Sequence, residues 1–202
     1  MNRASRFVVS GTGTDIGKTV FCAGLADLLG ARYWKPVQSG LEDETDSEAV
    51  ARLVPGAVVH PEAYRLVTPC SPHEAAARDG VAIGALPLPA GDGPLVVEGA
   101  GGVLVPLSDT RVYADQFAEW ALPVVLVART SLGTINHTLL SLEALRARGC
   151  AVAGVIFSGD ENIETQRVIV MLGKVRLLGR VPRLDPVTPE TLRAAFAGID
   201  TP

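Results

Sequence analysis

This sequence contains little cysteine and nearly equal numbers of acidic and basic residues. The first feature argues against disulfides and zinc sites, and the second against nucleic-acid and membrane partners. The 202 residues include three cysteines, which lie far apart and form no C-x-x-C pair, so neither a disulfide framework nor a zinc site is indicated. The formal net charge is −4, and lysines and arginines do not gather in runs. We therefore expect no nucleic-acid partner and no membrane partner.

Long hydrophobic stretches are missing as well. The first segment, MNRASRFVVSG, has too few consecutive apolar residues for a signal peptide or a membrane span. Together with the odd number of widely spaced cysteines, this favours a cytoplasmic protein. Apolar residues make up 48% of the chain and charged residues 20%, which is typical of a globular protein with a substantial core. We expect one domain spanning residues 1–202.

Short apolar segments alternate with helical patterns along the chain. Such segments are RFVVSG, YWKPVQSG, PLVVEGAGG, PVVLVAR, AVAGVIFSG and LLGRVP. They are rich in β-branched residues, and most end in glycine or a small polar residue, as strands buried on both faces of a parallel sheet do. GKTVFCAGLADLLG and TINHTLLSLEALRARG carry apolar residues at helical spacing. The sequence therefore predicts an α/β fold, with a surface connection at the Pro- and Gly-rich residues 84–94.

The segment GTGTDIGKT lies between a strand signal and a helical pattern, which is the context of a phosphate-binding loop. Five residues separate Gly11 from Gly17, one more than in the usual G-x-x-x-x-G-K-S/T pattern. In such a loop, backbone N–H groups surround a polyphosphate, Lys18 contacts its outer oxygens and the Thr19 hydroxyl binds Mg²⁺. The alternative is a glycine-rich turn that binds nothing.

Further polar residues follow two other strand signals. Lys35 and Ser39, in KPVQSG, and Glu98, in VVEGAGG, come at the carboxyl ends of predicted strands, the edge at which open α/β sheets bind ligands. A lysine in an apolar strand is suited to a phosphate or carboxylate partner, and Glu98 is suited to Mg²⁺, directly or through water. The alternative for Lys35 is a lysine that faces water from an edge strand.

Asp46 begins a helical pattern in ETDSEAVARL. Taken by itself, this position favours an N-terminal cap or a carboxylate that interacts with the helix dipole. The histidines, His60, His73 and His137, have no metal-ligand spacing and no paired nucleophile, so we interpret them as structural or peripheral.

Taken together, these motifs resemble those of the dethiobiotin synthetase family. The phosphate loop of that family follows G-T-D-T-x-V-G-K-T, with the same five residues between its glycines. The resemblance extends in order through KPVQSG, SPHEAAARDG, VVEGAGG, SLGTINHTLL and LGRVP, and so covers nearly the whole chain. It implies a three-layer α/β fold of the phosphate-loop NTPase type, with a mostly parallel central sheet and helices on both faces.

The resemblance also implies a reaction. A homodimeric ligase would use ATP or another nucleoside triphosphate, CO₂ and 7,8-diaminononanoate to form the ureido ring of dethiobiotin, with Mg²⁺ as cofactor. Because the path runs through a carbamate and a carbamoyl-phosphate anhydride, it needs positioning and charge neutralisation more than a covalent nucleophile.

The same resemblance implies roles for individual residues, in four groups. Catalysis is implied for Lys18, Lys35, Thr14 and Ser39. Mg²⁺ binding is implied for Thr19, Asp46 and Glu98. Nucleotide contacts are implied for Gly13, Thr14, Asp15, Ile16, Gly17, Lys18, Thr19, Val20, Glu98, Gly101, Gly102, Ser158 and Pro182. Substrate contacts are implied for Ser39 and for a helix N-terminus of the other subunit, formed by Gly133, Thr134, Ile135 and Asn136.

Three positions depart from the family pattern. Gly13 replaces the usual aspartate, Asp15 stands where glutamate is common, and Ser158 takes the place of an asparagine whose amide reads adenine. A hydroxyl does not offer the paired donor and acceptor of an amide. We therefore expect weak discrimination among nucleoside triphosphates, unless Asn162 supplies an amide from a displaced loop.

Two other protein classes share parts of this pattern. Partitioning and metal-transport ATPases carry a second lysine near the start of the loop, whereas that region reads Gly11-Thr12-Gly13 here. Switch proteins of the GTPase type carry an N-K-x-D motif, which this sequence does not contain. Triphosphate turnover with and without the diamine separates these classes from the ligase.

Overall fold

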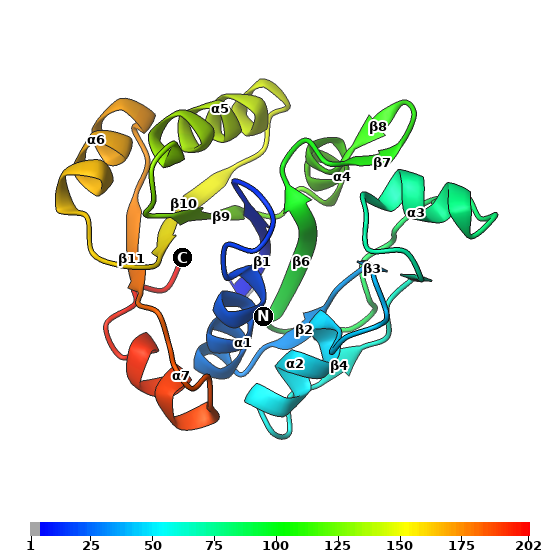
Figure 1. Ribbon diagram of the computed structural model, residues 1–202, viewed down its shortest axis with the longest axis horizontal. Coiled ribbons are helices and arrows are strands. Elements are labelled where there is room, and N and C mark those ends of the chain that lie inside the picture. Colours follow the sequence, from blue (N-terminus) through cyan, green and yellow to red (C-terminus); the bar gives the residue numbers. More distant parts are fainter. Residues whose placement is uncertain (1–4) are drawn as a thin grey trace.

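Parallel strands form a central sheet in the computed structural model, which describes residues 5–202 (Figure 1). Within those residues its seven strands are β1 (Arg6–Gly11), β2 (Arg32–Trp34), β4 (Val59–His60), β6 (Leu95–Gly102), β9 (Val124–Arg129), β10 (Val152–Ser158) and β11 (Leu177–Val181). Their order across the sheet is β11-β10-β9-β1-β6-β2-β4, and each neighbouring pair is parallel. The carboxyl ends of β1, β2 and β6, where the sequence predicts ligands, therefore lie side by side.

Helices cover both faces of this sheet (Figure 1). One face carries α1 (Lys18–Leu29), α2 (Asp46–Leu53) and α7 (Pro189–Phe196), and the other carries α4 (Tyr113–Trp120), α5 (Thr134–Ala147) and α6 (Ile163–Gly173). Strand β1 supplies both cores, because successive side chains point to opposite faces. Val8 packs in the core beneath α4 and α5, and Val9 packs in the core beneath α1. The three-layer α/β prediction is confirmed.

Two small strand pairs and α3 (Pro72–Arg78) stand beside the main sheet. They are the parallel pair β3 (Val37–Ser39) and β5 (Tyr64–Leu66), and the antiparallel pair β7 (Pro106–Ser108) and β8 (Arg111–Val112). The interpretation of YWKPVQSG as one strand was wrong. Pro36 lacks an N–H group, and the segment divides there into β2 in the main sheet and β3 in a small one.

The helices that frame the site begin and end at identifiable signals. Helix α1 follows Gly17, and its last turn closes on Gly30, whose N–H bonds the carbonyls of Ala26 and Asp27 in a left-handed cap. Helix α2 begins with a capping box in which Thr45 and Glu48 bond each other's backbone N–H groups. Thr45 is thus the cap, and Asp46 is the first helical residue, free to use its carboxylate elsewhere.

None of the helices within residues 5–202 combines the length and apolar character needed to cross a membrane.

Candidate functional site

The segment between β1 and α1 turns sharply enough to require glycine. Gly17 has φ +84°, and a Cβ there would lie 2.6 Å from Oγ of Ser158, so a side chain would be strained by both conformation and contact. Helix α1 starts immediately afterwards with Lys18, which is buried and donates a hydrogen bond to the Gly13 carbonyl at 2.7 Å. The loop therefore wraps around its own lysine at a helix N-terminus, the arrangement that binds phosphates.

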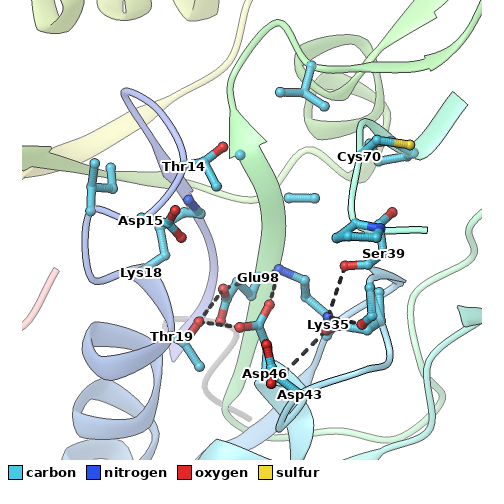
Figure 2. A pocket seen from close by; sticks show the side chains of 18 of the residues that line it. Thr14, Asp15, Lys18, Thr19, Lys35, Ser39, Asp43, Asp46, Cys70 and Glu98 are labelled. Carbon is cyan, nitrogen blue, oxygen red and sulfur yellow. Dashed lines mark hydrogen bonds and ion pairs between the residues drawn. The ribbon is translucent and has the colours of Figure 1, made fainter. Parts of the chain in front are cut away.

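A pocket with a volume of about 840 Å³ opens over this loop. Figure 2 shows Thr14, Asp15 and Lys18 on one side, Ser39 and Cys70 on the other, and Glu98, Lys35 and Asp46 at the floor between them. Its volume is in the range of small-molecule sites. The structure thus brings one group of predicted site residues to a single pocket, namely Thr14, Asp15, Ile16, Gly17, Lys18, Thr19, Val20, Lys35, Ser39, Asp46, Glu98 and Gly101.

Two carboxylates and a lysine meet at the floor of the pocket. Lys35 Nζ lies 2.6 Å from Asp46 Oδ2 and 3.2 Å from Glu98 Oε1 (Figure 2). Lys35 is 3% exposed and Glu98 is fully buried. The alternative of an edge-strand lysine facing water was therefore wrong. Strand β4 pairs with β2 on its outer side, so β2 is not an edge strand, and the ammonium group has two anionic partners.

The Thr19 hydroxyl lies against both carboxylates. Its Oγ1 is 2.6 Å from Asp46 Oδ1 and 3.0 Å from Glu98 Oε1. A hydroxyl has one proton to donate, so it cannot satisfy both carboxylate oxygens at once. A hydroxyl and two carboxylates converging in this way are oxygen ligands of the kind that Mg²⁺ prefers, and Mg²⁺ commonly takes one or two carboxylates together with substrate phosphates. These residues fit that cation.

Burial and charge act against each other at these ionisable groups. Burial lowers the pKa of Lys35, but the negative charges of Glu98 and Asp46 outweigh it, so its pKa is raised above the ordinary value. Burial raises the pKa of Asp46, but the charge and hydrogen bond of Lys35 outweigh it, so its pKa is lowered. For Lys18 burial prevails over the attraction of Glu98, and its pKa is lowered. A bound anion would therefore stabilise the charged form of Lys18 more than that of Lys35, which already has two anionic partners.

Two residues that sequence reasoning missed hold this floor in place. Tyr33 is fully buried in β2, and its hydroxyl donates to Glu98 Oε2 at 2.8 Å. Burial and then the charge of Glu98 raise the pKa of Tyr33 well above its ordinary value, so the hydroxyl stays a donor. Gln38 accepts from the Asp46 N–H at 3.3 Å and donates to the Ser39 carbonyl at 3.4 Å. A tyrosine in a buried strand needs a hydrogen-bond partner, and that signal was available in the sequence.

The rim of the pocket includes residues that the sequence motifs did not single out. Acidic side chains of Glu42, Asp43 and Glu44 lie along the segment that leads into α2, and residues 69–72 also line the pocket, of which Ser71 and Pro72 begin the motif SPHEAAARDG. On the loop side, Gly101 has φ +60°, and a Cβ there would lie 3.4 Å from Oγ1 of Thr14. The same Cβ would lie 2.8 Å from Cγ2 of Val105, so the left-handed conformation and this contact, not the approach to Thr14, require glycine at the end of β6.

Several predicted residues do not line this pocket. Gly13 supplies the carbonyl that Lys18 bonds, Gly102 pairs with Gly11 between the two strands, and Ser158 lies against Gly17. Pro182 follows β11, one residue after the partner of Ser158 in the sheet. A separate group lies at the start of α5, where Thr134 is buried, Ile135 is half-buried, and Gly133 and Asn136 are exposed to solvent. These four residues are outside the pocket of their own chain.

Solved structures share this architecture. The cell division ATPase MinD from Pyrococcus furiosus superposes with a TM-score of 0.56 at 13% identity, covering 94% of this chain and 90% of that one. A ParA family ATPase from Chlorobium tepidum gives a TM-score of 0.53 at 11% identity, covering 95% and 90%. At such low identity the likeness concerns the fold, which is that of the phosphate-loop NTPases.

Sequence relatives are much closer than these structural neighbours. The ATP-dependent dethiobiotin synthetase BioD of Rhodopseudomonas palustris (strain HaA2) is 65% identical over 194 residues, which cover 94% of this chain and 91% of the relative. The protein of the same name from Agrobacterium fabrum is 62% identical over 196 residues, covering 95% and 92%. The AAA domain family (AAA_26) matches residues 5–191. This chain therefore belongs to the AAA domain family and, within it, to the ATP-dependent dethiobiotin synthetases.

Proposed function

We propose that this protein is a dethiobiotin synthetase that forms a ureido ring from 7,8-diaminononanoate, CO₂ and ATP. The observation that carries the proposal is the floor of the pocket, where Lys35, Asp46, Glu98 and Thr19 meet directly beside the phosphate loop. One pocket thus offers a phosphate site and, next to it, a lysine and a serine suited to a second anion. A reaction that joins a carboxylated amine to a phosphoryl group requires this pair of sites.

The reaction proceeds in three steps in this proposal. One amine attacks CO₂ and loses a proton, which gives a carbamate. A carbamate oxygen attacks the γ-phosphorus, the bond to the β-phosphate oxygen breaks, and the nucleoside diphosphate leaves. The second amine then attacks the carbamate carbon, the bond to the phosphate oxygen breaks, and loss of a proton and of phosphate closes the ring. No covalent enzyme nucleophile is required, so the side chains act by position and charge.

The side chains divide this work according to where they lie. Lys18 and the loop N–H groups hold the β- and γ-phosphates, and Thr14 donates beside them. Ser39 faces the loop from across the pocket and Lys35 lies at the floor between them (Figure 2), and together they hold the carbamate. The Ser39 hydroxyl is buried and has no hydrogen-bond partner within residues 5–202, so it is ready to donate to a ligand oxygen.

Thr19, Asp46 and Glu98 are the residues that would hold Mg²⁺. When bound, this cation supplies positive charge where the triphosphate and the leaving group accumulate negative charge. Lys18 and Lys35 together only balance the charges of Asp46 and Glu98, so a triphosphate bound beside them requires an additional cation. The proposal also includes nucleotide contacts by four residues outside the lining of the pocket, namely Gly13, Gly102, Ser158 and Pro182.

A homodimer with a shared substrate site completes the proposal. The substrate's distal carboxylate would bind at the start of α5 of the other subunit, at the amides of Gly133, Thr134 and Ile135 and the side chain of Asn136. Helix α5 follows Gly133, and no side chain within residues 5–202 caps its first turn. The Thr134 N–H bonds the Ser131 carbonyl at 3.2 Å, so the N–H groups of Gly133 and Ile135 are the ones available to a carboxylate without displacing a partner. A cytoplasmic location belongs to the proposal too, and the three free cysteines support it.

A coupled assay tests the proposed function. Purified protein is supplied with 7,8-diaminononanoate, bicarbonate, Mg²⁺ and ATP, and dethiobiotin and phosphate are measured together. We expect dethiobiotin and phosphate in equal amounts, and little phosphate when the diamine is omitted. Phosphate release that ignores the diamine and bicarbonate would contradict the ligase and would favour a plain ATPase of the same fold.

A further inference from the structure

Tyr33 lies beneath the pocket floor, in the strand segment YWKPVQSG but outside the motif KPVQSG. It stands in β2, its side chain is fully buried, and its ring packs in the core formed with α1 and α2. Its hydroxyl donates a hydrogen bond to Glu98 Oε2 at 2.8 Å. A phenylalanine ring would fill the same space in this core, so what the hydroxyl adds is its hydrogen bond to Glu98.

The two oxygens of Glu98 have different surroundings. Oε1 faces the pocket side, 3.0 Å from the Thr19 hydroxyl and 3.2 Å from Lys35 Nζ. Oε2 faces the core and accepts from Tyr33. The last torsion of a glutamate is broad and poorly restrained by its own rotamer preference. Donors on both oxygens are therefore needed to fix the plane of this carboxylate.

We propose that Tyr33 is a positioning residue, whose hydroxyl holds Glu98 so that Oε1 stays directed at Thr19 and Asp46, in the orientation that binds Mg²⁺ beside the triphosphate. This inference rests on the proposed function, in which Glu98 is a metal ligand. Outer hydrogen bonds to ligating carboxylates commonly change metal affinity by about 10- to 100-fold. Tyr33 touches no reacting atom and acts through Glu98.

The Tyr33→Phe variant isolates the hydroxyl, because it keeps the ring. Binding of a non-hydrolysable ATP analogue is measured by calorimetry with Mg²⁺ and with EDTA. We expect affinity without Mg²⁺ within about twofold of wild type, because the loop contacts are unchanged, and a gain in affinity from Mg²⁺ that is about tenfold smaller. This readout needs no turnover.

Tyr113→Phe is the matched control. Tyr113 is as deeply buried as Tyr33, belongs to the core on the other face of the sheet, and makes no hydrogen bond to a side chain of residues 5–202. We expect the same gain from Mg²⁺ in this variant as in wild type. A double-mutant cycle with Glu98→Gln adds a second criterion, because removing the Tyr33 hydroxyl should have no further effect on the Mg²⁺ gain once the carboxylate is gone.

The outcomes are distinguishable. A Tyr33→Phe protein that melts at a lower temperature but keeps the wild-type gain from Mg²⁺ would overturn the positioning role and leave the proposed function intact. An equal loss in Tyr33→Phe and Tyr113→Phe would also overturn it, because any buried hydroxyl would then suffice. A wild-type protein whose nucleotide affinity ignores Mg²⁺ would overturn the metal site of the proposed function and this inference with it.

Discussion

The floor of the pocket and the start of α5 are two candidate binding regions built on opposite principles. At the floor, Lys35 pairs with both Asp46 and Glu98, Lys35 and Glu98 are buried, and the side chain of Asp46 is 29% exposed. At the start of α5, Gly133 and Asn136 are exposed, and the helix N–H groups have no capping side chain among the described residues. The first region is organised by its own chain, whereas the second offers donors that need an incoming group.

Because of this difference, we expect substitutions in the two regions to have different effects. Charges held in a buried network strengthen electrostatic interactions with a developing anion and need no rearrangement during the reaction. Exposed helix N–H groups compete with water and contribute less to affinity. Substitutions at the floor should therefore damage chemistry and folding together, and substitutions at the start of α5 should damage the binding of one ligand only.

The largest effect is expected from the two pocket lysines. Lys18→Ala and Lys35→Ala should each lower dethiobiotin formation by about 10²- to 10³-fold, because each removes a positive charge where negative charge accumulates. Steady-state turnover of each variant, with circular dichroism to verify folding, measures this. Lys174→Asn is the control, because Lys174 is the remaining lysine, is exposed after α6 and has the left-handed backbone that asparagine tolerates. Near-normal turnover in both pocket variants would refute the roles assigned to them.

Asp46 should make stability depend on pH in the acid range. Its pKa is lowered in the folded protein, so its stabilising effect is present above the ordinary aspartate value of about 4 and is lost as the pH falls through the lowered pKa. Asp46→Asn should cost about 1 to 3 kcal/mol of unfolding free energy at pH 7, because Lys35 loses a partner. Urea unfolding of both proteins between pH 7 and pH 3 measures the difference, which should shrink below pH 4. A difference that stays constant across this range would exclude the ion pair as its origin.

A smaller and more selective effect is expected at the start of α5. Asn136→Ala should weaken binding of the diamine by about tenfold, the cost of one hydrogen bond to a charged group, and leave nucleotide binding within about twofold. Calorimetry with each ligand separates the two affinities. Glu143→Ala, an exposed change on the same helix, serves as control. A variant that loses nucleotide affinity and keeps diamine affinity would argue against a shared substrate site.

The smallest effect is expected on the preference for one nucleoside triphosphate over another. We propose that Ser158 takes the position of an adenine-reading amide, so specificity constants for ATP, CTP, GTP and UTP should lie within about a hundredfold of one another. The structure uses the Asn162 side chain to cap α6, where it accepts from the Thr165 N–H at 3.1 Å. Asn162→Ala should therefore leave the preference unchanged, although it removes the cap. A stronger preference for ATP that disappears in this variant would assign base reading to Asn162.

The sequence was sufficient for the parts of the site that are local in the chain. A strand, a glycine-rich turn and a helix follow each other between Arg6 and Leu29, so the loop with Lys18 could be predicted from this local context although its glycine spacing is one residue longer than usual. The carboxyl-edge rule placed Lys35 and Glu98 near the loop, because parallel strands end at one edge of the sheet. The division of YWKPVQSG was available from Pro36 and was nevertheless missed.

The sequence was insufficient for residues that meet across the fold. Asp46 reads as a helix cap from its neighbours, and Thr45 takes that place while Asp46 turns to Lys35. The Tyr33 hydroxyl meets Glu98 from 65 positions away, and no periodicity or motif carries that pairing. Such contacts depend on which strands become neighbours, and that order is a property of the sheet as a whole.

By itself, the sequence determined the α/β fold and the phosphate loop, because apolar periodicity and glycine positions act over a few residues. Tertiary structure decided the pairing at the floor, because despite burial the pKa of Lys35 is raised and that of Asp46 is lowered by opposing charges that meet only once β2, β6 and α2 are assembled. It also decided that the start of α5 lies outside the pocket of its own chain, since helix α5 packs against its own face of the sheet and leaves Gly133 and Asn136 exposed away from the pocket.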